Sequence, residues 1–244
     1  MRNIRLCIAY KGTNYAGWQR QPNALGIETV ITEAIRNLTG EQVVLYGSGR
    51  TDAGVHALGQ CANFHTESSI PDERFAAALN TKLPRDIRIL KSEQVAPEFH
   101  SRYSAKGKRY MYQLDLSPIE SPFYYEFSWH VNWKLDIDQM QKAAENFVGT
   151  HDFRAFMASG SHVKDTVRTV RSIDFVEKDN RLQIYFEGNG FLYNMVRIMT
   201  GTLVDVGIGK IEPGYIRSII NSLDRSQAGI TAPAQGLFLK KVFY

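Results

Sequence analysis

The segment Tyr46–Gln60, YGSGRTDAGVHALGQ, is the most informative stretch of the chain. It places glycines, an arginine, an aspartate and a histidine between two apolar segments, Val43–Tyr46 and Cys61–His65. Both flanking segments are rich in β-branched and aromatic residues, which predicts two strands. Glycine has no Cβ, so a glycine-rich turn lets the backbone approach a ligand closely. The sequence therefore predicts two strands joined by a candidate binding loop.

Arg50 and Asp52 form a polar pair within this loop. They stand two positions apart, so in an extended segment both side chains would leave the same face. A guanidinium close to a carboxyl group favours the ionised carboxylate. Because an ionised carboxylate can act as a nucleophile or a base at a sugar carbon, Asp52 is the candidate catalytic residue.

Two other interpretations fit the local composition. Thr51–Gly54 is also a plausible simple turn in which the aspartate bonds nearby backbone amides, and such turns are far commoner than catalytic aspartates. The Gly-Ser-Gly sequence at 47–49 is found in phosphate loops as well. However, the Lys-Ser/Thr pair of a Walker loop is missing, and the glycine spacing does not match the dinucleotide fingerprint. Nucleotide binding of that kind is not expected.

The order of residues as a block favours the catalytic interpretation. Gly49–His56, GRTDAGVH, closely resembles the catalytic loop of the tRNA pseudouridine synthases of the TruA family. Ile27–Thr29 departs from that family, which more often has Val-Gln-x there, but it lies at a helix start. Further blocks similar to the family follow in its order: Tyr10–Gln21, Lys108–Tyr112, Gly149–Phe153, Gly190–Arg197 and Ala232–Leu237.

The resemblance implies an isomerase that converts uridine to pseudouridine at positions 38, 39 and 40, in the anticodon stem-loop of tRNA. Asp52 would supply the catalytic carboxylate, kept charged by Arg50 and Arg197. Tyr110 would stack on the uracil, and Leu237 would close the other face of the pocket. Whether Asp52 attacks C1′, adds to the ring at C6 or removes a sugar proton stays open. A homodimer in which one tRNA touches both subunits is also implied.

Composition is that of an ordinary globular protein with a slight basic excess. The 244 residues are 43% hydrophobic and 22% charged, with a formal net charge of +4. This balance suits a local phosphate-binding face rather than a uniformly basic surface. Two cysteines, Cys7 and Cys61, are too few for a disulfide framework. No signal peptide or membrane span is predicted, so the expected location is the cytoplasm.

Apolar periodicity predicts elements along the whole chain. In the first half, strands are expected at Ile4–Tyr10, Gln60–His65 and Ile87–Val95, and helices at Ile27–Leu38 and Pro71–Leu83. In the second half, the expected strands are Lys108–Leu116, Leu237–Phe243 and a hairpin of Val167–Val176 with Leu182–Glu187, and the expected helices are Ile137–Val148, Phe191–Val206 and Pro213–Leu223.

This order predicts an α+β fold of two RRM/ferredoxin-like halves. The resemblance implies that the halves share a mixed, mainly antiparallel sheet with helices packed on it, and that the active cleft lies between them. The boundary is placed at the lapse in periodicity near Ser104–Gly107. Residues 1–105 would then be the N-terminal half with the catalytic loop, and residues 106–244 the C-terminal half.

The stretch Arg102–Tyr112, RYSAKGKRYMY, is a nucleic-acid signal that does not depend on the family. It interleaves tyrosines with cations and contains no acidic residue. Cations bind phosphates, and aromatic rings stack on unpaired bases, although a solvated strand edge fits equally well. The candidate RNA-binding residues are Arg102, Lys106, Lys108 and Arg109, with Lys164, Arg168 and Arg171 as a possible extension.

Neither a metal nor a cofactor is expected. The histidines, His162 among them, lack ligand spacing with cysteines or carboxylates. The isomerisation needs no redox cofactor, nucleotide or metal. His56 is expected to bond a backbone group near the loop, and His151 with Asp152 to cap the end of the preceding helix.

Two rival functions remain. A non-catalytic RNA-binding protein with two RRM-like halves would explain the basic, aromatic strand, but not the loop with Arg50 and Asp52, and the strands lack the RNP signature. A glycosidase or nucleotide hydrolase would use Asp52, but it needs a second carboxylate, and neither Asp165 nor Glu187 can be placed by sequence alone. Mapping pseudouridine in tRNA treated with the protein separates these two rivals from a pseudouridine synthase.

Overall fold

Alternating apolar and polar residues near the N-terminus form the first strand of a sheet. In the computed structural model, which describes residues 1–160 and 163–244, Ile4, Leu6 and Ile8 are fully buried, while Arg5 and Cys7 between them are partly exposed. That alternation is the period of a strand with one covered face. The strands are β1 (Arg2–Tyr10), β2 (Tyr46–Gly47), β3 (His56–Thr66), β4 (Ile87–Val95), β5 (Gly107–Asp115), β6 (Trp129–His130), β7 (Gly149–Asp152), β8 (Val167–Lys178), β9 (Arg181–Gly188) and β10 (Leu237–Phe243). The α-helices are α1 (Ile27–Thr39), α2 (Phe75–Asn80), α3 (Ile137–Glu145), α4 (Met195–Gly207) and α5 (Ile216–Ser222).

The chain divides into two compact units. The first unit is Met1–Lys106 together with Phe238–Tyr244, and the second unit is Gly107–Leu237. Most of the last strand therefore belongs with the N-terminal part of the chain.

The first unit contains a sheet in the order β4-β1-β3-β10. The strands β4, β1 and β3 are antiparallel, and β10 runs parallel to β3. The short β2 pairs with the other end of β3, where Tyr46 lies opposite Asn63. Because β2 ends at Gly47 and β3 begins at His56, the candidate loop occupies the short connection between these two strands.

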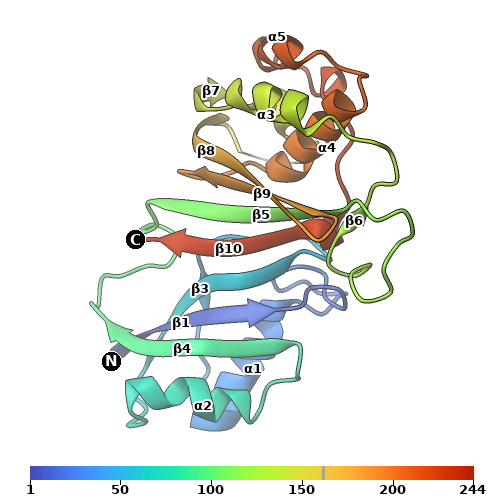
Figure 1. The fold of residues 1–244 in the computed structure, drawn as a ribbon. Helices are drawn as coiled ribbons and strands as arrows, with labels where there is room; N and C mark the ends of the chain where they lie inside the picture. Colours follow the sequence, from blue (N-terminus) through green and yellow to red (C-terminus); the bar gives the residue numbers. More distant parts are fainter. Residues whose placement is uncertain (161–162) are drawn as a thin grey trace. The chain divides into compact units, whose positions relative to one another are not determined.

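Two helices cover the apolar face of this sheet, and they lie next to each other (Figure 1). Ile27, Ile31 and Ile35 of α1 are fully buried, at the spacing of one helical face. Phe75 of α2 packs edge-to-face on Phe64 of β3, with 5.6 Å between the ring centroids. The core of the first unit therefore lies between β1, β3 and these helices.

The second unit contains an antiparallel sheet in the order β5-β9-β8-β7, with β6 parallel to β5. The hairpin β8–β9 turns at Asp179 and Asn180, whose φ angles are 51° and 56°. Positive φ at both turn residues is the mark of the type I′ turns that match strand twist. Helix α4 is buried over almost its whole length and packs beside α3, as Figure 1 shows.

The predicted α+β class is confirmed, and several boundaries are corrected. The predicted strand at Val43–Tyr46 is wrong except for its last residue, since only Tyr46–Gly47 pairs with β3. The predicted helix at Pro71–Leu83 is shorter. Its helical part ends at Asn80, whose side chain bonds both the N–H and the carbonyl of Ile89.

The helix expected from Phe191 begins at Met195, because Asn194 adopts a left-handed conformation with φ of 58°. The short strands β6 and β7 were not predicted. His151 and Asp152 belong to β7. The expected cap is found for His151, whose Nε2 lies 3.2 Å from the Val148 carbonyl in the segment after α3, but it is wrong for Asp152. Asp152 accepts a hydrogen bond from the N–H of Arg154 instead.

Candidate active site

Asp52 stands at the first position of a tight turn in the loop between β2 and β3. The N–H of Val55 donates to the Asp52 carbonyl oxygen at 3.1 Å, and Gly54 has φ of 78°. A positive φ at the third turn position is typical of a type II turn, which favours glycine there. The segment is therefore a turn, as one interpretation of the sequence held. The side chain of Asp52 is half-buried.

The N-terminal block Tyr10–Trp18 packs directly against this turn. The N–H of Trp18 donates to the Thr51 carbonyl at 3.0 Å, and the N–H of Gly54 donates to the Tyr15 carbonyl at 3.3 Å. The residues on both sides of Asp52 are thus bonded through their backbones to a segment far away in sequence. Such bonds fix the position of a loop without depending on particular side chains.

Two glycines make this close packing possible. A Cβ built on Gly17 would overlap the Thr51 carbonyl oxygen, and one on Gly12 would overlap that of Val55. Gly17 also has a φ of 88°, a backbone conformation that residues with a Cβ rarely adopt. Backbone therefore contacts backbone around Asp52, and no larger residue fits at either glycine.

A buried polar network holds the residues that precede Asp52. The Tyr10 hydroxyl and the Thr51 hydroxyl are 2.8 Å apart. The buried Gln60 accepts a hydrogen bond from the Ser48 hydroxyl at 2.6 Å and donates to the Gly49 carbonyl at 2.9 Å. Burial raises the pKa of Tyr10, so its hydroxyl keeps its proton and can donate.

His56 has a structural position at the end of the loop. Its Nδ1 accepts a hydrogen bond from the N–H of Gly12 at 2.9 Å, and its ring stacks on Phe238 at 4.8 Å. Because Nδ1 is the acceptor, the neutral ring carries its proton on Nε2. The predicted bond to a backbone group is confirmed.

Arg50, the other predicted residue of this loop, is solvent-exposed. It lies in the first unit with Asp52, whereas Tyr110, Arg197 and Leu237 lie in the second unit.

Tyr110 is buried on β5 of the second unit. Its ring meets Phe191 edge-to-face, with centroids 5.3 Å apart and planes at 86°. On the sheet it stands opposite Phe186 of β9. The ring is therefore fixed by aromatic packing, an arrangement that holds a stacking surface in place.

Tyr112, two positions further along β5, supports the segment that carries Leu237. Its hydroxyl donates to the Pro233 carbonyl at 2.7 Å, and a Cβ on Gly236 would lie only 2.6 Å from its ring. Burial raises the pKa of Tyr112 well above its usual value, which keeps the donor protonated. Leu237 itself is buried.

Arg197 of α4 is tied to the same segment. Its Nε donates to the Ala232 carbonyl at 2.7 Å, and its Nη1 donates to Asn194 Oδ1 at 2.8 Å. The N–H of Ala232 donates back to the Arg197 carbonyl at 3.1 Å. The second unit thus brings Arg197 together with the segment that ends at Leu237.

The predicted RNA-binding cations differ in their surroundings. Arg102 and Lys106 are exposed in the first unit. Lys108 and Arg109 are half-buried on β5, and the sheet register places Glu187 opposite Arg109. The Nε of Arg109 lies 3.0 Å from one carboxylate oxygen of Glu187. The stretch Arg102–Tyr112 contains no acidic residue of its own, but the neighbouring strand β9 places the carboxylate of Glu187 beside it.

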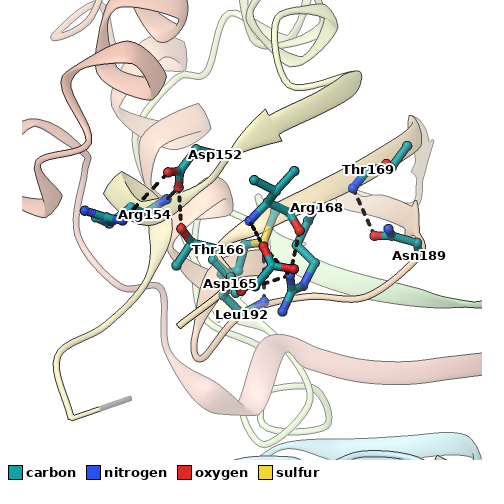
Figure 2. Close-up of polar contacts among 10 residues, drawn as sticks. Asp152, Arg154, Asp165, Thr166, Arg168, Thr169, Asn189 and Leu192 are labelled. Atoms are coloured by element: carbon teal, nitrogen blue, oxygen red, sulfur yellow. Dashed lines mark hydrogen bonds and ion pairs between the residues drawn. The ribbon is translucent and has the colours of Figure 1, made fainter. Parts of the chain in front are cut away.

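The extension at Lys164, Arg168 and Arg171 is also partly neutralised. Arg171 lies 3.9 Å from Glu187, and Nη1 of Arg168 lies 3.9 Å from the carboxylate of Asp165. Figure 2 shows Arg168 beside Asp165. Lys164 and Arg171 are exposed, and Arg168 is half-buried.

Sequence reasoning missed the residues that hold the candidate site in place. Gly12, Gly17, Gln60 and Tyr112 position the predicted residues, and none of them was assigned this supporting role. The sequence signal for the two glycines was the Gly-x-x-x-x-Gly spacing within Tyr10–Gln21. Only the fold reveals that this segment packs against the Asp52 turn.

Neither a metal centre nor a membrane helix is found among the described residues. No group of three or more His, Cys, Asp or Glu side chains in residues 1–160 and 163–244 is arranged to hold a metal ion. In the same residues, no helix is long and apolar enough to cross a membrane. His162 lies outside the described residues.

Comparison with known proteins points to one class. A family model described as tRNA pseudouridine synthase matches residues 6–104 and 143–244. Proteins named tRNA pseudouridine synthase A from Acetivibrio thermocellus and Thermoanaerobacter sp. are 52% and 48% identical over the full length of both chains. One from Ruminiclostridium cellulolyticum is also 52% identical, again over the full length of both chains. A solved Cbf5-Nop10-Gar1 complex has a chain with 13% identity and a TM-score of 0.37, covering 82% of this chain and 54% of that chain, which is too weak a likeness to interpret.

The class these matches define is that of the pseudouridine synthases, which are isomerases because pseudouridine has the same atoms as uridine. The chain belongs to the tRNA pseudouridine synthase family. Asp52, Arg50, Arg197 and Leu237 fall within the residues that the family model matches, while Tyr110 falls between its two segments.

Proposed function

We propose that the protein isomerises uridine to pseudouridine at positions 38, 39 and 40, in the anticodon stem-loop of tRNA, with Asp52 as the catalytic carboxylate. The turn fixed by Gly17 and Trp18 carries the proposal, because backbone contacts on both sides of the half-buried Asp52 hold its main chain in place. A fixed position is what a nucleophile or base needs, since misplacement by about 1 Å can cost about 100-fold in rate.

The reaction exchanges one bond at the sugar for another. The N1–C1′ bond breaks, a C5–C1′ bond forms, C5 loses its proton and N1 gains one. The isomerisation involves no net oxidation or reduction, so the proposed mechanism needs no redox cofactor, and none of its steps demands a metal as a Lewis acid. The carboxylate of Asp52 acts on the nucleotide by attack at C1′, by addition at C6 or by removal of a sugar proton. All three routes begin from the same ionised carboxylate.

The other proposed site residues bind the reacting nucleotide. Tyr110 stacks on the uracil, and Leu237 closes the apolar side of the pocket. Their burial and packing within the second unit support these roles, because rigid apolar surfaces retain a base at low entropic cost. Arg50 and Arg197 keep the carboxylate ionised, and the exposed position of Arg50 also suits it to fill the space of an extruded base.

The wider proposal concerns RNA binding and assembly. Extruding a base costs a few kcal/mol, and less at a loop or stem end, which favours the anticodon stem-loop as the target. Arg102, Lys106, Lys108 and Arg109 bind its phosphates, and the protein works as a cytoplasmic homodimer. The two halves are RRM/ferredoxin-like, a reading that the order β1-α1-β2-β3-α2-β4 of the first half supports.

One experiment tests the proposal directly. The protein is incubated with unmodified tRNA transcripts, and pseudouridine is mapped by position, for the parent and for Asp52→Asn. The parent should modify positions 38 to 40, and the variant should bind tRNA but form no pseudouridine, because the amide has no nucleophilic charge.

The matched control is Asp72→Asn, another half-buried aspartate of the first unit, whose carboxylate accepts a bond from the N–H of Gln94. It should keep its activity. Turnover of Asp52→Asn within about tenfold of the parent, a barrier change of only about 1.4 kcal/mol, would refute the catalytic role.

A further inference from the structure

Three rings form a continuous aromatic ladder on the first unit. Tyr46 lies 4.8 Å from His100, and His100 lies 4.4 Å from Tyr103, between ring centroids. The ladder begins at Tyr46, two residues before the Ser48–Thr51 segment that leads to Asp52. It ends in solvent, where Tyr103 is 77% exposed. The ladder therefore joins the candidate loop to the protein surface.

The turn that presents Tyr103 is firmly anchored to the sheet below. The fully buried Ser101 donates its N–H to Asn63 Oδ1 at 2.8 Å and accepts a bond from the Tyr244 hydroxyl at 2.8 Å. The N–H of Ser104 closes the turn on the His100 carbonyl at 2.9 Å. A ring on such a base loses little conformational freedom when a ligand stacks on it.

The charges around this ring are those that suit nucleic acid. The guanidinium of Arg102 lies 5.7 Å from the centre of the Tyr103 ring, and Lys106 is exposed three residues further along the chain. From Phe99 to Lys106 there is no acidic residue. Single exposed tyrosines are ordinary, but a rigid aromatic ladder with adjacent cations is the arrangement on which unpaired bases stack.

We propose that the ladder of Tyr46, His100 and Tyr103 is a stacking site for an unpaired base of the RNA substrate, with Arg102 at its rim. This inference rests on the proposed function for the identity of the RNA. The role of this stacking site is to bind and orient single-stranded RNA next to the Asp52 loop, outside the pocket of the reacting uridine. Tyr103 is the outer ring and provides the accessible face.

The test uses an oligomer that cannot be isomerised. Affinity for a labelled (rC)12, which contains no uridine, is measured for the parent, Tyr103→Ala and Tyr103→Phe across a salt series. The alanine variant should bind about 5- to 150-fold more weakly, which is the range for one lost stacking contact. The phenylalanine variant should stay within about twofold of the parent, and neither change should alter the salt slope, because no phosphate contact is removed.

Tyr215→Ala is the matched control, since Tyr215 is an exposed tyrosine of the second unit, and it should bind like the parent. The stacking site is refuted if Tyr103→Ala keeps parental affinity, if Tyr103→Phe is as weak as Tyr103→Ala, or if the parent does not bind (rC)12. Pseudouridine mapping on tRNA with the same proteins separates the two proposals. If the parent makes no pseudouridine but its affinity for (rC)12 depends on Tyr103, the proposed reaction is refuted and the stacking site is supported.

Discussion

The two units hold their candidate site residues by different physical means. In the first unit, the turn at Asp52 is fixed by backbone packing, because Gly12 and Gly17 let two segments meet without side chains between them. In the second unit, the segment that ends at Leu237 is held mainly by side chains, namely the Tyr112 hydroxyl and the Arg197 guanidinium, with one backbone bond from Ala232 to Arg197 beside them.

This difference indicates how each part responds to mutation. Backbone packing fails abruptly, because every residue that could replace a glycine is larger and overlaps the neighbouring backbone. A side-chain network is weakened one bond at a time, since each lost hydrogen bond costs about 1 kcal/mol. The three tests that follow examine this contrast, beginning with the largest expected effect.

Gly17→Ala should have the largest effect. The new Cβ overlaps the Thr51 carbonyl, and the backbone at φ of 88° strains any residue except glycine. We expect a loss of roughly 2 kcal/mol or more in the free energy of unfolding. Displacing the turn should also lower kcat for pseudouridine formation about 100-fold. Chemical denaturation and a tRNA turnover assay measure the two effects.

Gly40→Ala separates strain from displacement. Gly40 has a similar φ of 78°, but nothing lies within 4 Å of a Cβ built there. This variant should lose about 1 kcal/mol of stability and keep its activity. Equal losses of activity in the two alanine variants would show that the packing at Gly17 has no special role.

The second test compares one hydroxyl from each unit. Tyr10→Phe removes the contact with Thr51, and Tyr112→Phe removes the bond to Pro233. Because the first turn keeps its backbone bonds, Tyr10→Phe should lower kcat/KM by less than about threefold, whereas Tyr112→Phe should lower it about tenfold, the rate equivalent of one good hydrogen bond. The reverse ranking would contradict the contrast between the units.

The smallest effect concerns a glutamate of the second unit. Glu187 lies close to both Arg109 and Arg171, so Glu187→Gln removes a negative charge that partly neutralises these two cations. Binding of tRNA should tighten by about two- to fivefold, and the plot of log affinity against log salt should become steeper.

Glu93 of the first unit provides the control, since it lies between Arg5 and Lys91 in the same manner. Glu93→Gln should leave tRNA binding unchanged, because none of its partners belongs to the proposed RNA surface. Unchanged binding in Glu187→Gln would place the phosphate contacts elsewhere than on β5.

Local pattern predicted most elements, because strand alternation and helical periodicity are properties of neighbouring residues. The strands Ile87–Val95 and Leu237–Phe243 have the predicted bounds. The two-residue strands β2 and β6 have no pattern long enough to detect. The start of α4 at Met195 depends on one left-handed residue, Asn194, which composition does not indicate.

The candidate site also contains residues that the local sequence predicts and residues that only the fold reveals. The residues proposed for chemistry stand in recognisable blocks, so resemblance could select Asp52 and Tyr110. Their supports depend on pairings between distant segments, such as Gly17 against Thr51 and Arg109 against Glu187. A single sequence carries no record of which segments meet, and these partners could not be predicted.

The place of β10 has a consequence for how the protein is made. Its residues complete the sheet of the first unit by pairing with β3, although they are synthesised after the whole second unit. Domains generally fold in the order in which they leave the ribosome, but the first unit has to wait for β10 with the edge of β3 uncovered at His56 and Ala57. An unpaired strand edge is a template for aggregation. Interrupted synthesis that stops before Leu237 should therefore yield chains that aggregate, even though residues 1–106 are all present.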